Sequence, residues 1–147
     1  MERIRYIISR IIIVGCLLIA GCQKEAINSD MEGHWRLTEF VTSDGQTHPC
    51  ERLYYSLSLW VVEVAEKPAQ EGCGKFIGRL EYPEEGKVRM RDFVQRAATS
   101  DNGIPATADE LKPYGLNGTD NLLEIVKADG KELILQSEYA TLYLERF

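Results

Sequence analysis

Cysteine has the most reactive side chain in this chain, and Cys22 stands in the most informative context. A basic segment and then an apolar stretch over residues 11–19 precede it, with two small residues directly before the cysteine. The apolar stretch is too short to span a bilayer comfortably, and the whole pattern is typical of a secretory signal. We therefore expect this segment to direct export of the chain. The basic residues are Arg3, Arg5 and Arg10.

The run Ile19-Ala20-Gly21-Cys22 resembles the lipobox of bacterial lipoproteins. This resemblance implies that residues 1–21 are a lipoprotein signal peptide, cut before Cys22, and that the thiol carries diacylglycerol while the new amine is acylated. Several acyl chains hold a protein on a bilayer, since each buried methylene contributes about 0.8 kcal/mol and a single chain binds marginally. A plain signal anchor with a chance cysteine is the alternative.

The residues after Cys22 bear on where the anchored protein resides. No Asp follows the cysteine, which resembles lipoproteins sorted to the outer membrane, and Lys24-Glu25 resembles a short form of a surface-export signal. The expected location is the cell envelope, on the outer membrane, with its periplasmic and surface faces both open. Residues 22–31 are polar and without periodicity, so they predict a flexible tether.

Residues 32–147 are enough for one domain, and their charge limits its partners. The full chain has a net charge of −6, and residues 1–21 carry three Arg against one Glu, so the remainder is more acidic still. An acidic module is a poor candidate for binding nucleic acid or for lying flat on an anionic bilayer. We expect a monomer that reaches the membrane through its N-terminal lipid.

Groups for catalysis or metal binding do not converge in the sequence. The histidines, His34 and His48, lie in different segments without a metal-ligand spacing, and no nucleophile elbow or phosphate-binding loop is present. Most carboxylates fall in expected turns or at a helix start. We expect no enzyme activity, no metal and no cofactor. An outward basic strip could receive an acidic partner, although a solvated sheet face is the simpler interpretation; it comprises Arg79, Lys87, Arg89 and Arg91.

Period-two alternation from Gly33 onward predicts an all-β, antiparallel meander. In the first strand, Trp35, Leu37 and Val41 should share one face. The long apolar run over residues 53–65 switches parity once, which predicts a β-bulge that bends a single strand near residues 59–61. The expected strands are 34–42, 53–65, 76–82, 88–91, 122–126, 133–136 and 139–146.

One short helix is expected in the 106–116 region. Thr107 and Glu110 have the spacing of a capping box, and Pro113 limits how far the helix can run. So short a helix must be docked through Leu111 and Tyr114 to be stable. We expect it to be a lid that controls access to the interior, with a passive plug as the alternative.

Cys50 and Cys73 are candidates for a disulfide, because an exported protein meets an oxidising environment. If the strand between them is continuous, it separates them by roughly 40 Å, far beyond the roughly 7 Å that a disulfide allows between α-carbons. The alternative is a pair of small apolar thiols.

Gly33-His34-Trp35 at the start of the first strand, together with Arg146 near the C-terminus, resembles the lipocalin and fatty-acid-binding superfamily. Inward parity shared by Leu142, Leu144 and Arg146 would place the guanidinium over the Trp35 indole. The order of elements resembles small bacterial lipocalin-like, calycin-type lipoproteins of undetermined activity. This resemblance implies a barrel or half-barrel of about seven or eight strands.

The expected function is binding, in one of two forms. Either a small apolar ligand enters the barrel, or a filled barrel acts as a protein- or glycan-interaction module at the envelope. A cavity above roughly 300 Å³ would favour the first form, and a filled interior with an exposed aromatic patch would favour the second. The expected ligand-lining residues are Tyr55, Leu57, Leu59, Phe76, Leu80, Met90 and Leu135.

Overall fold

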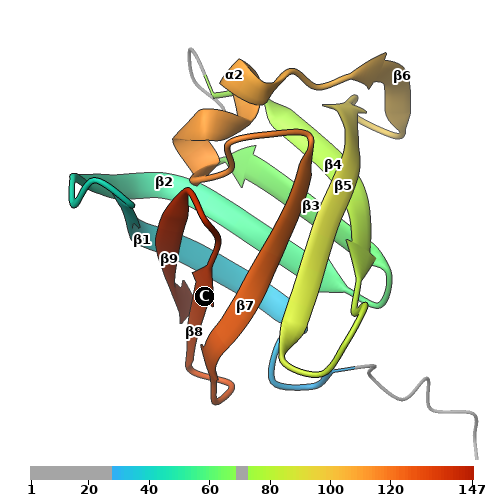
Figure 1. Ribbon diagram of the computed structural model, residues 1–147. Helices are drawn as coiled ribbons and strands as arrows, with labels where there is room; N and C mark the ends of the chain where they lie inside the picture. Colours follow the sequence, from blue (N-terminus) through green and yellow to red (C-terminus); the bar gives the residue numbers. More distant parts are fainter. Residues whose placement is uncertain (1–27, 69–72) are drawn as a thin grey trace, which may run out of the picture.

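One antiparallel sheet closes on itself to form a barrel (Figure 1). The computed structural model describes residues 28–68 and 73–147, so the expected signal peptide, Cys22 and most of the tether lie outside it. Eight strands close the barrel through the pairing of β4 with β5, and β6 pairs with the last residues of β5, beyond the stretch that pairs with β7. The all-β fold is confirmed, as a closed barrel plus one extra strand. Among the described residues, none of the helices has the length and apolar character needed to cross a bilayer.

The strands follow the alternation of the sequence closely. Inward positions such as Leu37, Val88 and Met90 are fully buried and join one hydrophobic core. The elements are β1 (Gly33–Thr42), β2 (Thr47–Ser58), β3 (Val61–Glu66), β4 (Lys75–Glu81), β5 (Lys87–Arg96), β6 (Asp101–Pro105), α2 (Ala108–Leu111), η1 (Lys112–Tyr114), β7 (Asp120–Ala128), β8 (Glu132–Gln136) and β9 (Ala140–Arg146).

The parity switch in the 53–65 run comes from a chain reversal, so the predicted bulge in one continuous strand is wrong. β2 ends at Ser58, Leu59 and Trp60 form the turn, and β3 returns antiparallel from Val61. Leu59 has a φ of 51°, which a tight turn demands although leucine rarely adopts it. Nothing in the residue types marks this turn, because it lacks the usual Gly, Asn or Asp.

A bulge occurs instead in β1, where the register shifts between Leu37 and Glu39. The shift reverses the parity beyond it, so Phe40 is buried and Val41 is only half-buried. The expectation that Val41 shares the inward face of Trp35 is therefore wrong. The extra residue at the bulge moves the side chains that follow it to the opposite face of the strand.

β5 runs longer than the expected 88–91, and β6 was expected as loop. Asp92 has a φ of 55° and shifts the alternation, so that Phe93 faces the core. β6 is exposed along its whole length and pairs with the end of β5. None of its side chains is buried, so its sequence lacks the alternation of apolar and polar residues by which a strand is predicted.

One end of the barrel is closed by Trp35 and Arg146. Trp35 is fully buried, and the Arg146 guanidinium carbon lies 4.1 Å from the indole centroid, inside the expected cation–π reach of about 6 Å. Arg146 also donates to the carbonyls of Glu32 and Gly130 at 2.6 and 2.8 Å. We call this the closed end; the first described residues and the β2–β3 turn also lie here (Figure 1).

The expected short helix is present over the opposite end (Figure 1). The Thr107 hydroxyl accepts from the Glu110 amide and the Glu110 carboxylate accepts from the Thr107 amide, which completes the capping box. α2 has only four residues and continues as the 3₁₀ turn η1, which holds Pro113. Gly115 ends it in the left-handed region with a φ of 79°.

Candidate functional site

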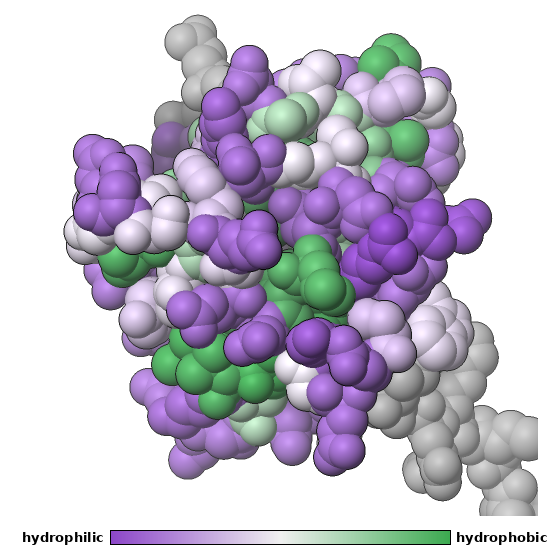
Figure 2. Space-filling model, viewed as in Figure 1, coloured by the Kyte–Doolittle hydropathy of each residue, from purple (hydrophilic) through white to green (hydrophobic). Residues whose placement is uncertain are grey.

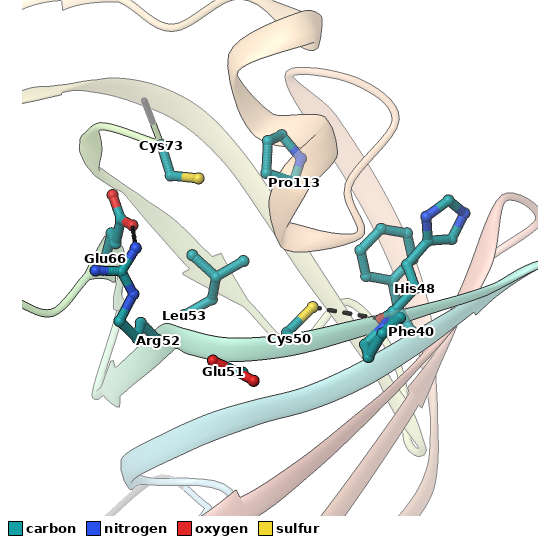
Figure 3. Close-up of a pocket in the computed structure, with 10 residues that line it drawn as sticks. Phe40, His48, Cys50, Glu51, Arg52, Leu53, Glu66, Cys73 and Pro113 are labelled. Carbon is teal, nitrogen blue, oxygen red and sulfur yellow. Dashed lines mark hydrogen bonds and ion pairs between the residues drawn. The ribbon is translucent and has the colours of Figure 1, made fainter. Parts of the chain in front are cut away.

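A cleft of about 380 Å³ opens at the end of the barrel that α2 and η1 cover (Figure 3). We call it the mouth cleft. β1, β2 and β3 supply most of its wall, and η1 and the chain just before β4 complete it. Its lining residues are Phe40, His48, Pro49, Cys50, Glu51, Arg52, Leu53, Glu66, Cys73 and Pro113.

The apolar part of the mouth cleft follows from the β1 bulge and from the alternation of β2. The bulge turns Phe40 inward, where its ring stacks on His48 with centroids 4.6 Å apart and planes 12° apart. Leu53 shares the inward face of Tyr55 and forms part of the wall. Pro113, in η1, lies across from them (Figure 3).

Glu66 is one of several residues of this site that the sequence prediction missed. It continues the inward parity of Val62 and Val64 and pairs in register with Leu53, so a carboxylate faces the barrel interior. Its Oε1 accepts from Arg52 Nη2 at 2.7 Å, and its side chain is only 6 % exposed. Its Oε2 is buried without a hydrogen-bond partner in the described part of the chain. Inward parity alone marks Glu66 in the sequence, once the turn at residues 59–60 is known.

Both cysteines line the mouth cleft as free thiols. No continuous strand separates them by roughly 40 Å, as the sequence predicted it would, because the chain reverses between them. Burial raises the pKa of Cys50 to about 11, with the nearby Cys73 and Glu39 adding to the shift. Burial also raises the pKa of Cys73. Both groups are therefore neutral thiols at neutral pH, with little thiolate for nucleophilic or metal chemistry.

Two tyrosines fix η1 above the cleft. The Tyr55 hydroxyl donates to the Tyr114 carbonyl at 2.5 Å, and the two rings meet edge to face with centroids 6.3 Å apart. The Tyr114 hydroxyl donates to the Gly74 carbonyl at 2.6 Å. Burial raises the pKa of both phenols, so both stay donors at neutral pH. Leu111 and Tyr114, the expected lid residues, are both fully buried.

The expected ligand-lining residues lie elsewhere than the mouth cleft. Leu59 is in the β2–β3 turn at the closed end and is half-buried. The other six are buried in the hydrophobic core below the cleft: Tyr55, Leu57, Phe76, Leu80, Met90 and Leu135.

The outward basic strip is neutralised by carboxylates. Each of its four residues has an acidic partner, so the strip offers little net charge to an acidic protein. His34 bonds the Ser56 hydroxyl through Nδ1, and the described residues hold no cluster of three metal-ligating side chains. The pairs of the strip are Arg79–Asp92, Lys87–Glu84, Arg89–Asp120 and Arg91–Glu81.

The model of the lipocalin-like domain family matches residues 16–147, so the chain belongs to that family. The solved structure of a lipocalin-like protein from Bacteroides uniformis is similar, at 14 % identity and a TM-score of 0.60, over 80 % of this chain and 99 % of that one. An uncharacterized protein from Bacteroides eggerthii is similar at 13 % identity and a TM-score of 0.57, over 79 % and 98 % of the chains. A search of curated proteins finds no match.

Proposed function

We propose that this protein is a lipid-anchored, lipocalin-like binding protein of the bacterial envelope, and that it holds a small ligand in the mouth cleft. The observation that carries the proposal is a cleft of about 380 Å³ that is lined by both apolar and charged side chains. Sites for small molecules have this size, about 300–1,000 Å³, and combine apolar surface with polar groups that fix the orientation of the ligand. Because the hydrophobic core occupies the barrel below, the ligand lies at the mouth instead of deep inside.

Binding suits the groups of the cleft better than catalysis does. The thiols of Cys50 and Cys73 are neutral at neutral pH, and the Glu66 carboxylate is paired with Arg52. Neither arrangement supplies an activated nucleophile with an adjacent base. We therefore assign the cleft a binding role.

The position of the tether supports this use of the cleft. The chain enters the described structure at Asn28 and reaches β1 at the closed end, where the Met31 carbonyl accepts from Trp35 Nε1. α2 covers the other end of the barrel (Figure 1). The mouth cleft lies at that end, with Pro113 of η1 in its wall. An acylated Cys22 at the outer membrane would hold the closed end nearer the bilayer and leave the cleft open to the aqueous side.

Native mass spectrometry of the protein isolated from the membranes of its own host tests the proposal. We expect wild type and Cys50→Ser to retain a small-molecule adduct. Cys50→Phe should lose it, because the larger ring fills the cleft. Bare masses for all three proteins, each still folded by circular dichroism, would contradict binding in the cleft.

The outer face of β7 supports a second candidate function, binding of a glycan or protein. Figure 2 shows apolar side chains gathered over β7 and β8 on this face, where Leu122 and Val126 are 49 % and 55 % exposed. A groove of about 420 Å³ runs beside Leu122, with Asn121 and Tyr139 in its wall. Leu122→Asp should abolish cross-linking to an envelope partner that Cys50→Phe leaves intact. The reverse result would assign the partner to the mouth cleft.

A further inference from the structure

The buried carboxylate of Glu66 has an unused acceptor at the mouth cleft. Oε1 is taken by Arg52, whereas Oε2 is buried and has no partner among the described residues. A buried charged acceptor without a donor carries a desolvation penalty that native structures normally avoid. A donor supplied from outside the chain would remove that penalty, and Glu66 lines the mouth cleft, which is open to such a donor.

The charge around the cleft selects the kind of donor. Among the described residues that line the cleft, Arg52 is the one Lys or Arg, and its charge is already matched by Glu66. Glu51 adds a further carboxylate to the lining, and Glu39 is near enough to influence Cys50. Both thiols are neutral, so they offset none of this negative charge. A cationic donor is thus favoured over a neutral one, and an anion is disfavoured.

The walls beside Glu66 select the remainder of the ligand. Phe40, Leu53 and Pro113 present apolar surface to the same space, and the Cys50 and Cys73 side chains extend it (Figure 3). An apolar body would be removed from water against these residues. A bare ammonium ion would leave this surface unused.

We infer that the mouth cleft binds a primary amine that carries an apolar body, with the ammonium group pairing with the Glu66 carboxylate and the body lying against Phe40, Leu53 and Pro113. This inference rests on the proposed function and specifies its ligand class. Glu66 is the specificity-determining residue. Free alkylamines and the head groups of aminolipids share this chemistry.

Calorimetric titration with octylamine, octanol and octanoate tests the inference on the folded mature chain. Octylamine should bind about tenfold or more tighter than octanol, which is the advantage of a hydrogen bond to a charged group, and octanoate should bind weakest. Glu66→Gln should abolish the preference for the amine and keep octanol binding. Glu51→Gln, which removes an exposed carboxylate from the same cleft, should keep most of the preference.

Arg52→Gln tests the inference independently, in case the Glu66→Gln variant does not fold. It frees Oε1 and removes the matching positive charge, so octylamine should bind more tightly to it than to wild type. A short-chain phosphatidylethanolamine, tested in parallel, separates the two sources of amine. Binding of either amine that depends on Glu66 supports the inference, and their relative affinities identify the source.

Different results would contradict the amine assignment and the proposed binding function. Equal affinities for the three octyl compounds, or tightest binding of octanoate, would overturn the amine assignment and leave the cleft as a binding site. Equal loss of the preference in Glu51→Gln and Glu66→Gln would overturn the role of Glu66. No binding of any of the three compounds would overturn the proposed function itself.

Discussion

Trp35 should be the residue on which the stability of the closed end depends most. Its side chain is fully buried, and its Nε1 donates to the Met31 carbonyl at 2.7 Å. An aromatic side chain buries roughly 150–250 Å², worth about 4–6 kcal/mol at about 25 cal/mol per Å², and measured Trp→Ala losses are about 3–5 kcal/mol. We expect Trp35→Ala to lower the free energy of unfolding by about 3–5 kcal/mol.

Arg146→Ala should cost less, about 1–2 kcal/mol. It removes the guanidinium stacked 4.1 Å from the indole centroid and two hydrogen bonds to carbonyls, but Arg146 itself is exposed. Arg146→Lys keeps the charge and is the matched control. Gly33→Ala should cost at least as much as Arg146→Ala, because Gly33 has a φ of 136° and a Cβ there would lie 1.7 Å from Arg146 Nη1.

Urea unfolding followed by far-ultraviolet circular dichroism measures all four variants. A double-mutant cycle between Trp35 and Arg146 isolates their coupling, for which we expect about 0.5–2 kcal/mol. A loss below about 1 kcal/mol for Trp35→Ala, which is typical of an exposed site, would refute the reasoning. So would a larger loss for Arg146→Ala than for Trp35→Ala.

Three further predictions concern the thiol, the helix and the anchor. Because its pKa is about 11 and the ordinary value is 9.0, Cys50 should react with iodoacetamide at pH 8 about a hundredfold more slowly than a free cysteine, and the rate should rise toward pH 11. If Cys50 does not react at any pH until the protein is reduced, it forms a disulfide with Cys73. Tyr114→Phe should raise uptake of an apolar fluorescent probe without changing the circular dichroism, because it removes the hydrogen bond that ties η1 to Gly74. Leu111→Ala should lower the free energy of unfolding by about 2–5 kcal/mol through lost packing. Unchanged uptake in Tyr114→Phe would show that the helix is a passive plug. Cys22→Ser should abolish acyl labelling and release or stall the protein, and persistent labelling would refute lipid attachment at this residue.

Much of the barrel was predictable because burial follows alternation in antiparallel strands. The inward face of Trp35 and Leu37, the capping box at Thr107 and the stop at Gly115 all have local causes in the sequence. The turn at Leu59 was not predictable, because no residue there has the usual turn chemistry.

That one turn also decided how well the site could be predicted. It brings β3 back along β2, which sets Glu66 opposite Leu53 and places both cysteines in one cleft. The β1 bulge then turns Phe40 inward to complete the apolar wall. The turn after β2 and the bulge in β1 both act by changing the register between neighbouring strands, and the residue pattern within a single strand does not reveal such a change.

We propose that the ligand lies in the mouth cleft and not in the barrel core. Titration of the ¹⁵N-labelled mature domain with octylamine tests it directly by mapping amide chemical-shift changes. We predict saturable changes at Leu53, Glu66 and Cys73, which line the cleft, and little change at Leu80 and Met90 in the core. Changes centred on Leu80 and Met90, or no saturable change at any amide, would contradict it.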